Sequence, residues 1–399
     1  MNEVVRLRYG KALTTSARTP GHIPVYGSNG VTGWHNVALA HGPTVVLGRK
    51  GQGPLGVEWC SGPFWVIDTA YYVEFSNERL LPRFFYYFTK YVGLNHLKDG
   101  TSNPSLTRAT FGIQQIPTPP LPEQRAIAHI LGSLDDKIEL NRKMNRTLEA
   151  LARAIFKSWF VDFDPVRAKA EGRPPPGMDA ETAALFPDGF EDSELGPIPR
   201  GWRVQSLDEI AHFLNGAACQ RFRPDGNEAT LPVIKIRELN QGITDRTDRA
   251  RASIPEKWHV HDGDVIFSWS GSLVVKVWTG GPGALNQHLF KVTSQSFPRW
   301  FYLSWVQHHL DTFRGIARDK ATTMGHIKRH HLTDAKCAVP SRAVLAAADE
   351  VLAPLIKRQV VNDLESRTLA ALRDTLLPKL VSGELRVPDP ERFLQEVAP

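Results

Sequence analysis

One stretch of helical pattern, residues 122–160, constrains the fold of this 399-residue chain more than any other feature. Apolar or amide side chains recur along it at alternating steps of four and three residues, which is the seam of a coiled coil. Pro122 suits a first helical turn, because a proline loses no hydrogen bond there. At about 1.5 Å per residue the helix would be roughly 55 Å long, and it cannot bury its stripe on itself. The sequence therefore predicts a partner helix for the seam positions Ile127, Leu131, Leu134, Ile138, Asn141, Asn145, Leu148, Ala152, Ile155 and Trp159.

Two of these seam positions, Asn141 and Asn145, are polar and have two interpretations. A buried asparagine commonly fixes the register of a coiled coil at a cost in stability, and we favour this interpretation. In the alternative, both asparagines face a second protein.

The sequence before this helix is repeated in the second half of the chain. Pro298–Tyr302 repeats Pro82–Tyr86 at an offset of 216 residues, and the loop 320–324 corresponds to the loop 99–103. Val339 and Pro340 then lead into a second helical stretch, as Leu121 and Pro122 lead into the first, at an offset of 218. A period of this length indicates a duplicated unit, a strand-rich module followed by a long helix.

The partner of the first helix is therefore the second, from about residue 342 to 380. Its apolar stripe is less regular, and we place its seam at Leu352, Ile356 and Leu364. The full stripe consists of Leu345, Leu352, Ile356, Leu364, Leu369, Leu372, Leu376 and Leu380. Pro354 should kink this helix or set its effective start, and Gly383 should end it. We expect an α+β fold with two strand-rich mixed α/β modules and two long helices that form an antiparallel coiled coil, related by a pseudo-two-fold axis. The predicted segments are 1–120 (first module), 121–161 (central helix), 162–196 (linker), 197–340 (second module), 341–387 (distal helix) and 388–399 (tail).

Only the two modules carry a net positive charge. Residues 1–120 carry a net charge of +5 and residues 197–340 carry +6, whereas 121–196 and 341–399 carry −4 and −1. Two basic modules on an acidic frame favour two contacts with a polyanion such as nucleic acid. Ordinary variation in surface charge is the alternative explanation.

Several classes of protein do not fit the sequence. There is no apolar run of about 18 residues for a membrane span, and the first residues lack the apolar core of a signal peptide. Three isolated cysteines make a disulfide framework or a zinc site a poor fit, so we expect a cytoplasmic protein.

A search for catalytic patterns points away from an enzyme. The loop 48–53 is not a phosphate-binding motif, since it lacks the Gly-Lys-Ser/Thr ending and a following helix, and a tight hairpin with a basic tip fits it better. Asn103-Pro104-Ser105-Leu106 approaches the signature of amino-methyltransferases but lacks the second proline and the aromatic residue. The histidine doublets 308–309 and 330–331 do not have the spacing of a helical metal site. We therefore expect no catalytic residue, no metal and no cofactor on this chain.

The residues best suited to contact nucleic acid lie in the loops of the two modules. They combine positive charge with amide and hydroxyl groups, the types that contact phosphates and base edges. The candidates in the first module are Arg49, Lys50, Gln52, Lys98, Ser102, Asn103 and Arg108, and those in the second are Arg221, Arg223, Lys235, Arg237, Lys276, Lys320, Thr322, Thr323, Lys328 and Arg329.

Five stretches of the sequence resemble a known family, the DNA-specificity (S) subunits of type I restriction–modification enzymes. Residues 121–169, LPEQRAIAHILGSLDDKIELNRKMNRTLEALARAIFKSWFVDFDPVRAK, resemble the central helical region of that family. ELGPIPRGWRVQSLDEIA (194–211) resembles the entry to its second target-recognition domain, and LLPKLVSGELRV (376–387) the end of its distal helical region. HIPVYGSNGVTGWHN (22–36) and GRKGQG (48–53) are similar to segments of its recognition domains.

The resemblance implies a non-catalytic reader of double-stranded DNA that acts in host defence. Each module would be a target-recognition domain that binds one half of a bipartite site, while the paired helices would set the gap and dock two methyltransferase (M) subunits. S-adenosylmethionine and ATP would belong to the methyltransferase and the restriction (R) subunits, respectively. The rival hypothesis is a coiled-coil scaffold or partner-binding protein whose basic modules do not read a DNA sequence.

Overall fold

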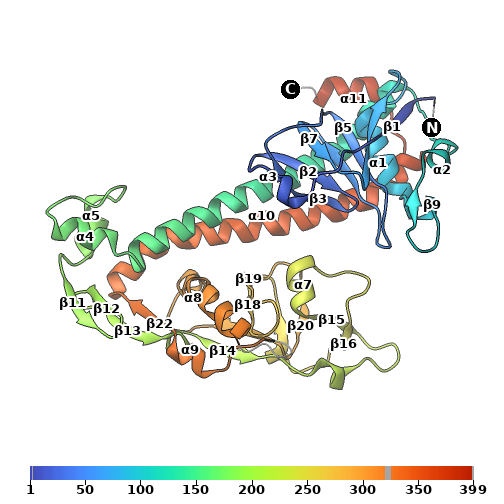
Figure 1. The fold of residues 1–399 in the computed structure, drawn as a ribbon. Helices are drawn as coiled ribbons and strands as arrows, with labels where there is room; N and C mark the ends of the chain where they lie inside the picture. The colour runs from blue at the N-terminus through green and yellow to red at the C-terminus, as the bar shows by residue number, and fades with distance from the viewer. Residues whose placement is uncertain (2, 320–324, 398–399) are drawn as a thin grey trace. The chain divides into compact units, whose positions relative to one another are not determined.

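The computed structural model describes residues 1, 3–319 and 325–397 and divides them between two units (Figure 1). The first unit consists of Met1–Ile138 with Thr368–Pro399, and the second of Glu139–Arg367. Two long helices, α3 (Leu121–Phe160) and α10 (Arg342–Ser382), each contribute a part to both units. The predicted mixed α/β fold with two strand-rich modules and a long helical pair is confirmed.

The first module is built on two four-stranded sheets. One sheet has the strand order β1-β8-β5-β6 and is antiparallel throughout, and the other has the order β3-β2-β7-β4 with β2 and β7 parallel. Helix α1 begins at Pro82, and its aromatic side chains from Phe84 to Phe88 are buried, whereas Tyr91 is exposed. The strands are β1 (Val5–Tyr9), β2 (Ile23–Gly27), β3 (Gly30–His35), β4 (Ala40–His41), β5 (Thr44–Gly48), β6 (Val57–Cys60), β7 (Pro63–Val66), β8 (Ala70–Phe75), β9 (Lys98–Asp99) and β10 (Ser105–Leu106). The helices are α1 (Pro82–Val92), α2 (Arg108–Gly112) and α11 (Pro390–Val397).

The second module repeats this architecture. Its antiparallel sheet has the order β14-β21-β18-β19, and its second sheet has the order β16-β15-β20-β17 with β15 and β20 parallel. The strands of this unit are β11 (Phe190–Ser193), β12 (Gly196–Pro199), β13 (Arg203–Ser206), β14 (His212–Asn215), β15 (Thr230–Ile234), β16 (Arg249–Arg251), β17 (His259–Val260), β18 (Val265–Ser268), β19 (Val275–Val277), β20 (Gly283–Leu285), β21 (Leu289–Thr293) and β22 (Lys336–Val339). Its shorter helices are α4 (Asp164–Ala170), α5 (Ala180–Leu185), α6 (Leu207–Ile210), α7 (Ile236–Gln241), α8 (Arg299–Asp319) and α9 (His330–Asp334). The identical strand orders and pairing directions bear out the duplication that the sequence repeat indicates.

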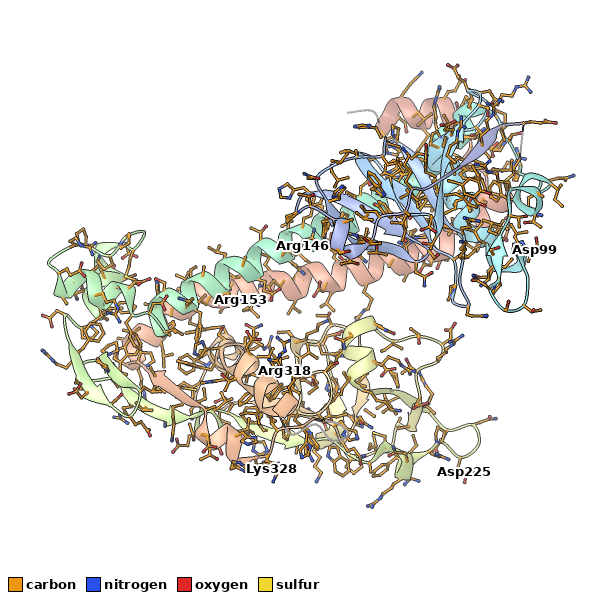
Figure 2. The ribbon with its side chains drawn as sticks, in the orientation of Figure 1. Asp99, Arg146, Arg153, Asp225, Arg318 and Lys328 are labelled. Carbon is orange, nitrogen blue, oxygen red and sulfur yellow. The ribbon has the colours of Figure 1, made fainter. Side chains whose placement is uncertain are left out.

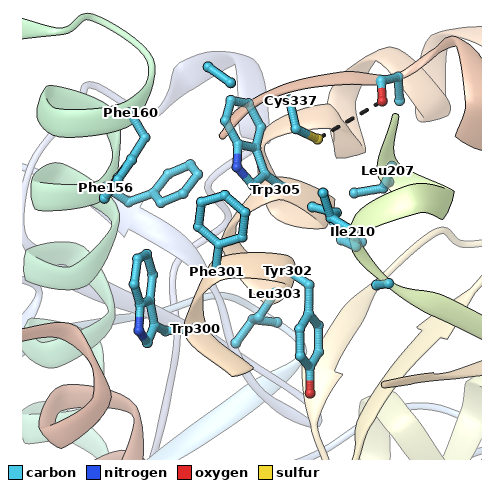
Figure 3. Close-up of a cluster of buried hydrophobic side chains, with 14 of the residues drawn as sticks. Phe156, Phe160, Leu207, Ile210, Trp300, Phe301, Tyr302, Leu303, Trp305 and Cys337 are labelled. Atoms are coloured by element: carbon cyan, nitrogen blue, oxygen red, sulfur yellow. Dashed lines mark hydrogen bonds between the residues drawn. The ribbon is translucent and has the colours of Figure 1, made fainter. Parts of the chain in front are cut away.

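Each core joins a module to the helical pair. In the second unit, Phe156 and Phe160 at the end of α3 point into a cluster with Trp300 and Trp305 of α8 (Figure 3). The indole nitrogen of Trp300 also donates to the carboxylate of Asp349 in α10, at 2.8 Å. Burying an aromatic side chain of this size contributes about 1.5–3 kcal/mol relative to leaving it exposed. The module and this part of the helical pair are therefore parts of one core.

The first unit has the matching arrangement with the roles of the two helices exchanged. Leu380 and Val381 at the end of α10 are buried in one cluster with Ile127 and Leu131 near the start of α3 and with the aromatic residues of α1. Gly383 follows α10 with a φ of 80°, and this left-handed conformation ends the helix where the sequence predicts.

Three expectations about the helices differ from the structure. Helix α10 runs without interruption through Pro354, so this proline does not set its start. Pro354 is exposed, so water can replace the hydrogen bond that its ring removes. Leu372, which the apolar pattern places in the stripe, is 46% exposed. The expected linker 162–196 contains α4 and α5 and buries Val166 and Phe186 in the core of the second unit, because these side chains cover the end of α3.

Candidate nucleic-acid interface

The first group of candidate residues lies where β5 leaves its sheet. Arg49 follows β5 directly, and its guanidinium carbon is 4.7 Å from the ring centre of Tyr9 and 5.5 Å from that of Tyr71. Arg108, the first residue of α2, stacks on Tyr9 at 4.1 Å. Within the described residues neither arginine has a carboxylate partner, and Arg49 donates from Nη1 to the carbonyl oxygen of Asp68 at 3.0 Å. We call Tyr9, Arg49, Tyr71 and Arg108 the first strand-end site.

The tyrosines give this site a fixed framework. Tyr9 and Tyr71 are paired across β1 and β8, with ring centres 5.0 Å apart. Burial raises the pKa of Tyr71 to about 12, so its hydroxyl stays protonated and donates to the carbonyl oxygen of Leu106 at 3.2 Å. Tyr9 is 46% exposed and carries the two guanidinium groups. The site is a preorganised cationic surface whose charge is not neutralised by a neighbouring carboxylate.

The two loops that carry the other candidates of the first module run side by side. The amide of Gly51 donates to the carbonyl oxygen of Pro104 at 3.1 Å. Lys98 donates from Nζ to the carbonyl oxygens of Gly51 and Gly53, at 3.2 and 3.0 Å, and Gln52 donates from Nε2 to that of Ser102 at 3.1 Å. The structure thus brings the two predicted groups together, but Lys98 and Gln52 hold the loops to each other. Asp99, labelled in Figure 2, begins the turn that ends at the exposed Ser102 and Asn103, and Lys50 forms a backbone bridge with Ser105.

The same backbone position exists in the second module. The amide of Ile327 donates to the carbonyl oxygen of Trp269 at 3.0 Å, as that of Leu106 donates to Arg49 at 2.8 Å. The isolated bridge between Ser270 and His326 likewise repeats the one between Lys50 and Ser105. Trp269 therefore occupies the place of Arg49. By the strand registers, Phe290 corresponds to Tyr71 and Asn215 to Tyr9, and Arg329 follows Ile327 at the distance at which Arg108 follows Leu106.

The side chains at this second strand-end site (Asn215, Trp269, Phe290 and Arg329) differ from those at the first. The Trp269 ring centre is 6.1 Å from that of Phe290, and its Nε1 donates to the amide oxygen of Asn215 at 3.1 Å. Arg329 stacks on Phe290 at 5.7 Å and has no carboxylate partner in the described part of the chain. Next to Trp269, the hydroxyl of Ser270 and Nδ1 of His288 are hydrogen-bonded at 3.1 Å. Arg329 is among the candidates named from the sequence and Trp269 is not, although alignment of the two halves at an offset of 220 places Trp269 opposite Arg49.

Three other candidates of the second module, Lys235, Arg237 and Lys276, form a separate group beside α7. Arg237 forms an ion pair with the buried carboxylate of Glu238 at 2.7 Å, and Lys235 forms one with Asp248. Lys276 donates from Nζ to the carbonyl oxygen of Leu239 at 2.9 Å. The pKa of the Asp248 carboxylate is lowered, first by its hydrogen bond with Lys235. The charges of Lys235 and Arg237 are thus neutralised by carboxylates, and Lys276 is bonded to the backbone of α7.

Arg221, Arg223 and Lys328 are exposed, and Lys328 is labelled in Figure 2 next to α9. Lys320, Thr322 and Thr323 lie outside the described residues. Among the described residues, no three histidine, cysteine, aspartate or glutamate side chains gather as they would to hold a metal ion. No helix in the same part of the chain has the length and apolar character needed to cross a membrane.

The predicted seam residues of α3 lie between the two long helices with graded burial. Ile127, Leu131, Ile138 and Asn141 are buried, whereas Leu134, Asn145, Leu148, Ile155 and Trp159 are half-buried. Near the end of α3 the buried stripe continues through Ala152, Phe156 and Phe160 at steps of four residues, because the module packs there. On α10, Leu352 and Ile356 are buried and Leu364 is half-buried.

The two asparagines contact α10 of the same chain. Asn141 donates from Nδ2 to the carboxylate of Glu365 at 2.9 Å and to the carbonyl oxygen of Asn362 at 3.3 Å. Asn145 donates to the carboxylate of Asp363 at 2.7 Å and accepts from Nδ2 of Asn362 at 2.8 Å. Since residue numbers rise on one helix as they fall on the other, the helices are antiparallel. In the first unit, Asp135 of α3 and Arg373 of α10 form an ion pair at 2.6 Å in the same register.

Comparison with known proteins finds similar sequences and a similar fold. Residues 1–150 match the family model described as Type I restriction modification DNA specificity domain. The HindI specificity subunit of Haemophilus influenzae is 25% identical over 374 residues, which is 80% of this chain and 81% of that protein. The MjaIX specificity subunit of Methanocaldococcus jannaschii is 26% identical over 323 residues, 78% of this chain and 71% of that protein.

The fold has a counterpart among solved structures. The crystal structure of the type I S subunit from M. genitalium covers 95% of this chain and 94% of its own, with a TM-score of 0.56 and 14% sequence identity. The resemblance found in the sequence is therefore confirmed: residues 1–150 match the DNA specificity domain, and most of the chain is similar to type I restriction–modification specificity subunits.

Proposed function

We propose that this chain is the DNA-reading subunit of a type I restriction–modification system. Each module reads one half of a bipartite site in double-stranded DNA, and the two long helices set the gap between the halves. The single observation that carries the proposal is the pair of strand-end sites, which occupy equivalent positions in the duplicated modules. Both expose a guanidinium group without a carboxylate partner among the described residues, and such groups neutralise DNA phosphates.

The outer faces of the helices support docking of two methyltransferase subunits. Leu140 and Leu151 of α3 are 50% and 46% exposed, and Val361 and Leu372 of α10 are 43% and 46% exposed. The two pairs are related by the same offset of 221 residues. In each pair the residues are eleven apart, which puts them on one face of their helix. Exposed apolar residues at repeated positions fit two copies of one partner.

The catalytic chemistry belongs to the partners in this proposal. The M subunits bind S-adenosylmethionine and methylate the DNA, and the R subunits bind ATP and cleave the DNA. This chain contributes positioning and sequence selection. The arginines at the strand-end sites fit that role, because they offer fixed positive charge and hydrogen-bond donors.

The test is to co-express the chain with its candidate M subunit and to map methylated adenines in the host DNA. A motif of two short defined parts with a fixed gap is the expected result. The chain purified alone, given S-adenosylmethionine and DNA, should transfer no methyl group. A single contiguous motif, or methylation without a motif, would contradict the two-module reader.

The scaffold hypothesis gives a different outcome in the same experiment. A coiled-coil scaffold would leave the methylation pattern of the M subunit unchanged, and its affinity for duplex DNA would not fall steeply with salt. A DNA reader that neutralises several phosphates should lose affinity linearly in the logarithm of the salt concentration.

A further inference from the structure

At one equivalent backbone position the two strand-end sites carry side chains of different chemistry, the charged Arg49 and the uncharged Trp269. Arg49 and Trp269 follow corresponding strands and accept corresponding backbone hydrogen bonds. Arg108 and Arg329 are the matched cations of the two sites, and each lies on an aromatic ring. Arg108 uses the ring of Tyr9, whereas Arg329 uses that of Phe290 because Asn215 stands in the place of Tyr9.

We propose that Arg108 and Arg329 make the same DNA-backbone contact in the two half-sites, and that Arg49 and Trp269 make the half-sites differ in sequence. This inference rests on the proposed function and assigns residues to it. The chemical target of the matched arginines is a phosphate of duplex DNA. The target of Arg49 is the major-groove edge of a guanine.

The assignment of Arg108 and Arg329 follows from their exposure and their lack of neutralisation. Both side chains are exposed, and no described carboxylate pairs with either. Other arginines of the same modules are neutralised, such as Arg8 by Glu74 at 2.7 Å and Arg237 by Glu238 at 2.7 Å. A cation that keeps its charge at the same place in both modules fits a contact that both half-sites share, and the sugar–phosphate backbone is that shared part.

The assignment of Arg49 follows from its fixed orientation. Its side chain is half-buried between Tyr9 and Tyr71, and one of its donors is occupied by the carbonyl oxygen of Asp68. A guanidinium group held in this way loses little entropy on binding and can present its remaining donors to O6 and N7 of guanine. Trp269 has no charge, and its indole N–H is already bonded to Asn215 and to the carbonyl oxygen of Gln287. The second module therefore cannot make this contact at the equivalent position.

The experiment uses the full chain in complex with its M subunit and a pool of random duplex DNA. Selection gives the base sequence (the letters) of each half-site. Titration of the selected duplex at several salt concentrations gives the salt slope, which is the fall in the logarithm of affinity with the logarithm of the salt concentration. Arg108→Ala and Arg329→Ala should each lower affinity about tenfold and reduce the salt slope by about 1, with unchanged letters in both halves. The matched controls are Arg6→Ala and Arg203→Ala, which remove exposed arginines on β1 and β13, and should leave the slope and the letters unchanged.

Two further variants separate charge from readout. Arg49→Lys keeps the charge and loses the planar fork, so it should relax the guanine preference in one half-site while the salt slope stays as in the unmodified chain. Trp269→Arg should change letters only in the other half-site and raise the salt slope by about 1. The substituted arginine can stack on Phe290 as Arg49 stacks on Tyr71, so the fold has a place for it.

The outcomes are distinct. If the unmodified complex selects no split motif, the proposed function fails. If it selects one but Arg108→Ala and Arg329→Ala behave like the controls, the shared backbone contact is refuted. An unchanged guanine preference in Arg49→Lys, or altered letters in both halves in Trp269→Arg, would refute the assignment of the differing residues. Thermal unfolding of each variant complex, expected within a few degrees of the unmodified one, excludes loss of fold as the cause.

Discussion

At the scale of single residues, the structure separates side chains that are free to act from those already engaged. Lys98, Gln52 and Lys276 all fit a DNA contact by residue type, and all three donate to carbonyl oxygens of neighbouring segments. The sequence cannot reveal this, because the acceptors lie on loops that only the fold brings close. Trp269 was missed for the opposite reason, since a tryptophan in an apolar stretch is usually a core residue.

His309 gives a prediction at the same scale. Burial, and to a lesser extent the neighbouring His308, lowers its pKa to about 4. Its Nε2 contacts the carbonyl oxygen of Lys336 at 2.9 Å, and its ring stacks on Trp305. The unfolded chain takes up a proton at this histidine near pH 6.5 and the folded chain only near pH 4, so stability falls as the pH falls through this range. At pH 5 the loss should be about 2 kcal/mol.

This pH effect can be measured by urea unfolding of the full chain at pH 7 and pH 5. His309→Gln keeps a donor for the carbonyl oxygen of Lys336. It should reduce the difference between the free energies of unfolding measured at pH 7 and pH 5. His22→Gln, at an exposed position, should leave the difference as it is. Equal pH effects in His309→Gln and in the unmodified chain would show that His309 is not the group responsible.

At the scale of elements, periodicity predicted α3 almost to the residue, and its failures have physical causes. The helix spans Leu121–Phe160, against an expected 122–160. The seam pattern did not reveal that Phe156 and Phe160 are more deeply buried than Ile155 and Trp159. The last turns of α3 pack on the second module as well as on α10. A heptad pattern describes only the packing of one helix on another. The expectation that Pro354 sets the start of α10 was wrong. A proline on the exposed face of a packed helix costs less stability than a proline on its buried face.

The helical pair gives a second prediction. Seven residues inserted after Lys143 of α3, together with seven after Asp363 of α10, keep the heptad seam and the antiparallel register. Seven residues add about 10 Å of helix, and a base pair occupies about 3.4 Å, so the gap should lengthen by up to about three base pairs. Methylation mapping should find the letters of both half-sites unchanged.

The matched control for this insertion is the seven-residue insertion in α3 alone. It leaves the polar contacts of Asn141 and Asn145 without partners in register, so it should lower the unfolding temperature. Changed letters with an unchanged gap in the double insertion would contradict the separation of reading from spacing.

At the scale of the whole molecule, the internal repeat in the sequence was the most informative feature. Short motifs such as Pro82–Tyr86 and Pro298–Tyr302 predicted two modules, and both contain sheets of the same strand order. The expected linker is where the whole-chain prediction was weakest. Its buried residues include a short group, Phe163, Pro165, Val166 and Ala168, and the distant Phe186, and this uneven spacing forms no periodic pattern.

The modular architecture gives a prediction at this scale. Replacing residues 1–120 by the corresponding segment of another family member exchanges Tyr9, Arg49 and Arg108 together. Because these residues belong to one strand-end site, only one half of the recognised motif should change. Methylation mapping in cells that carry the hybrid and the M subunit provides the measurement, and a hybrid with residues 197–340 replaced should change only the other half. A change in both halves from either exchange would contradict independent reading.

The division of the chain also has a consequence for the order in which the protein folds during synthesis. The second unit, residues 139–367, is continuous in sequence, so its synthesis is complete before that of Leu380 and Val381. The core of the first unit needs Leu380 and Val381, and Leu380 is made 274 residues (380 − 106) after Leu106, where the last strand of the first module ends. The first module therefore waits, with part of its aromatic core uncovered, until the end of α10 has been synthesised. During that interval it is the segment most in need of a chaperone.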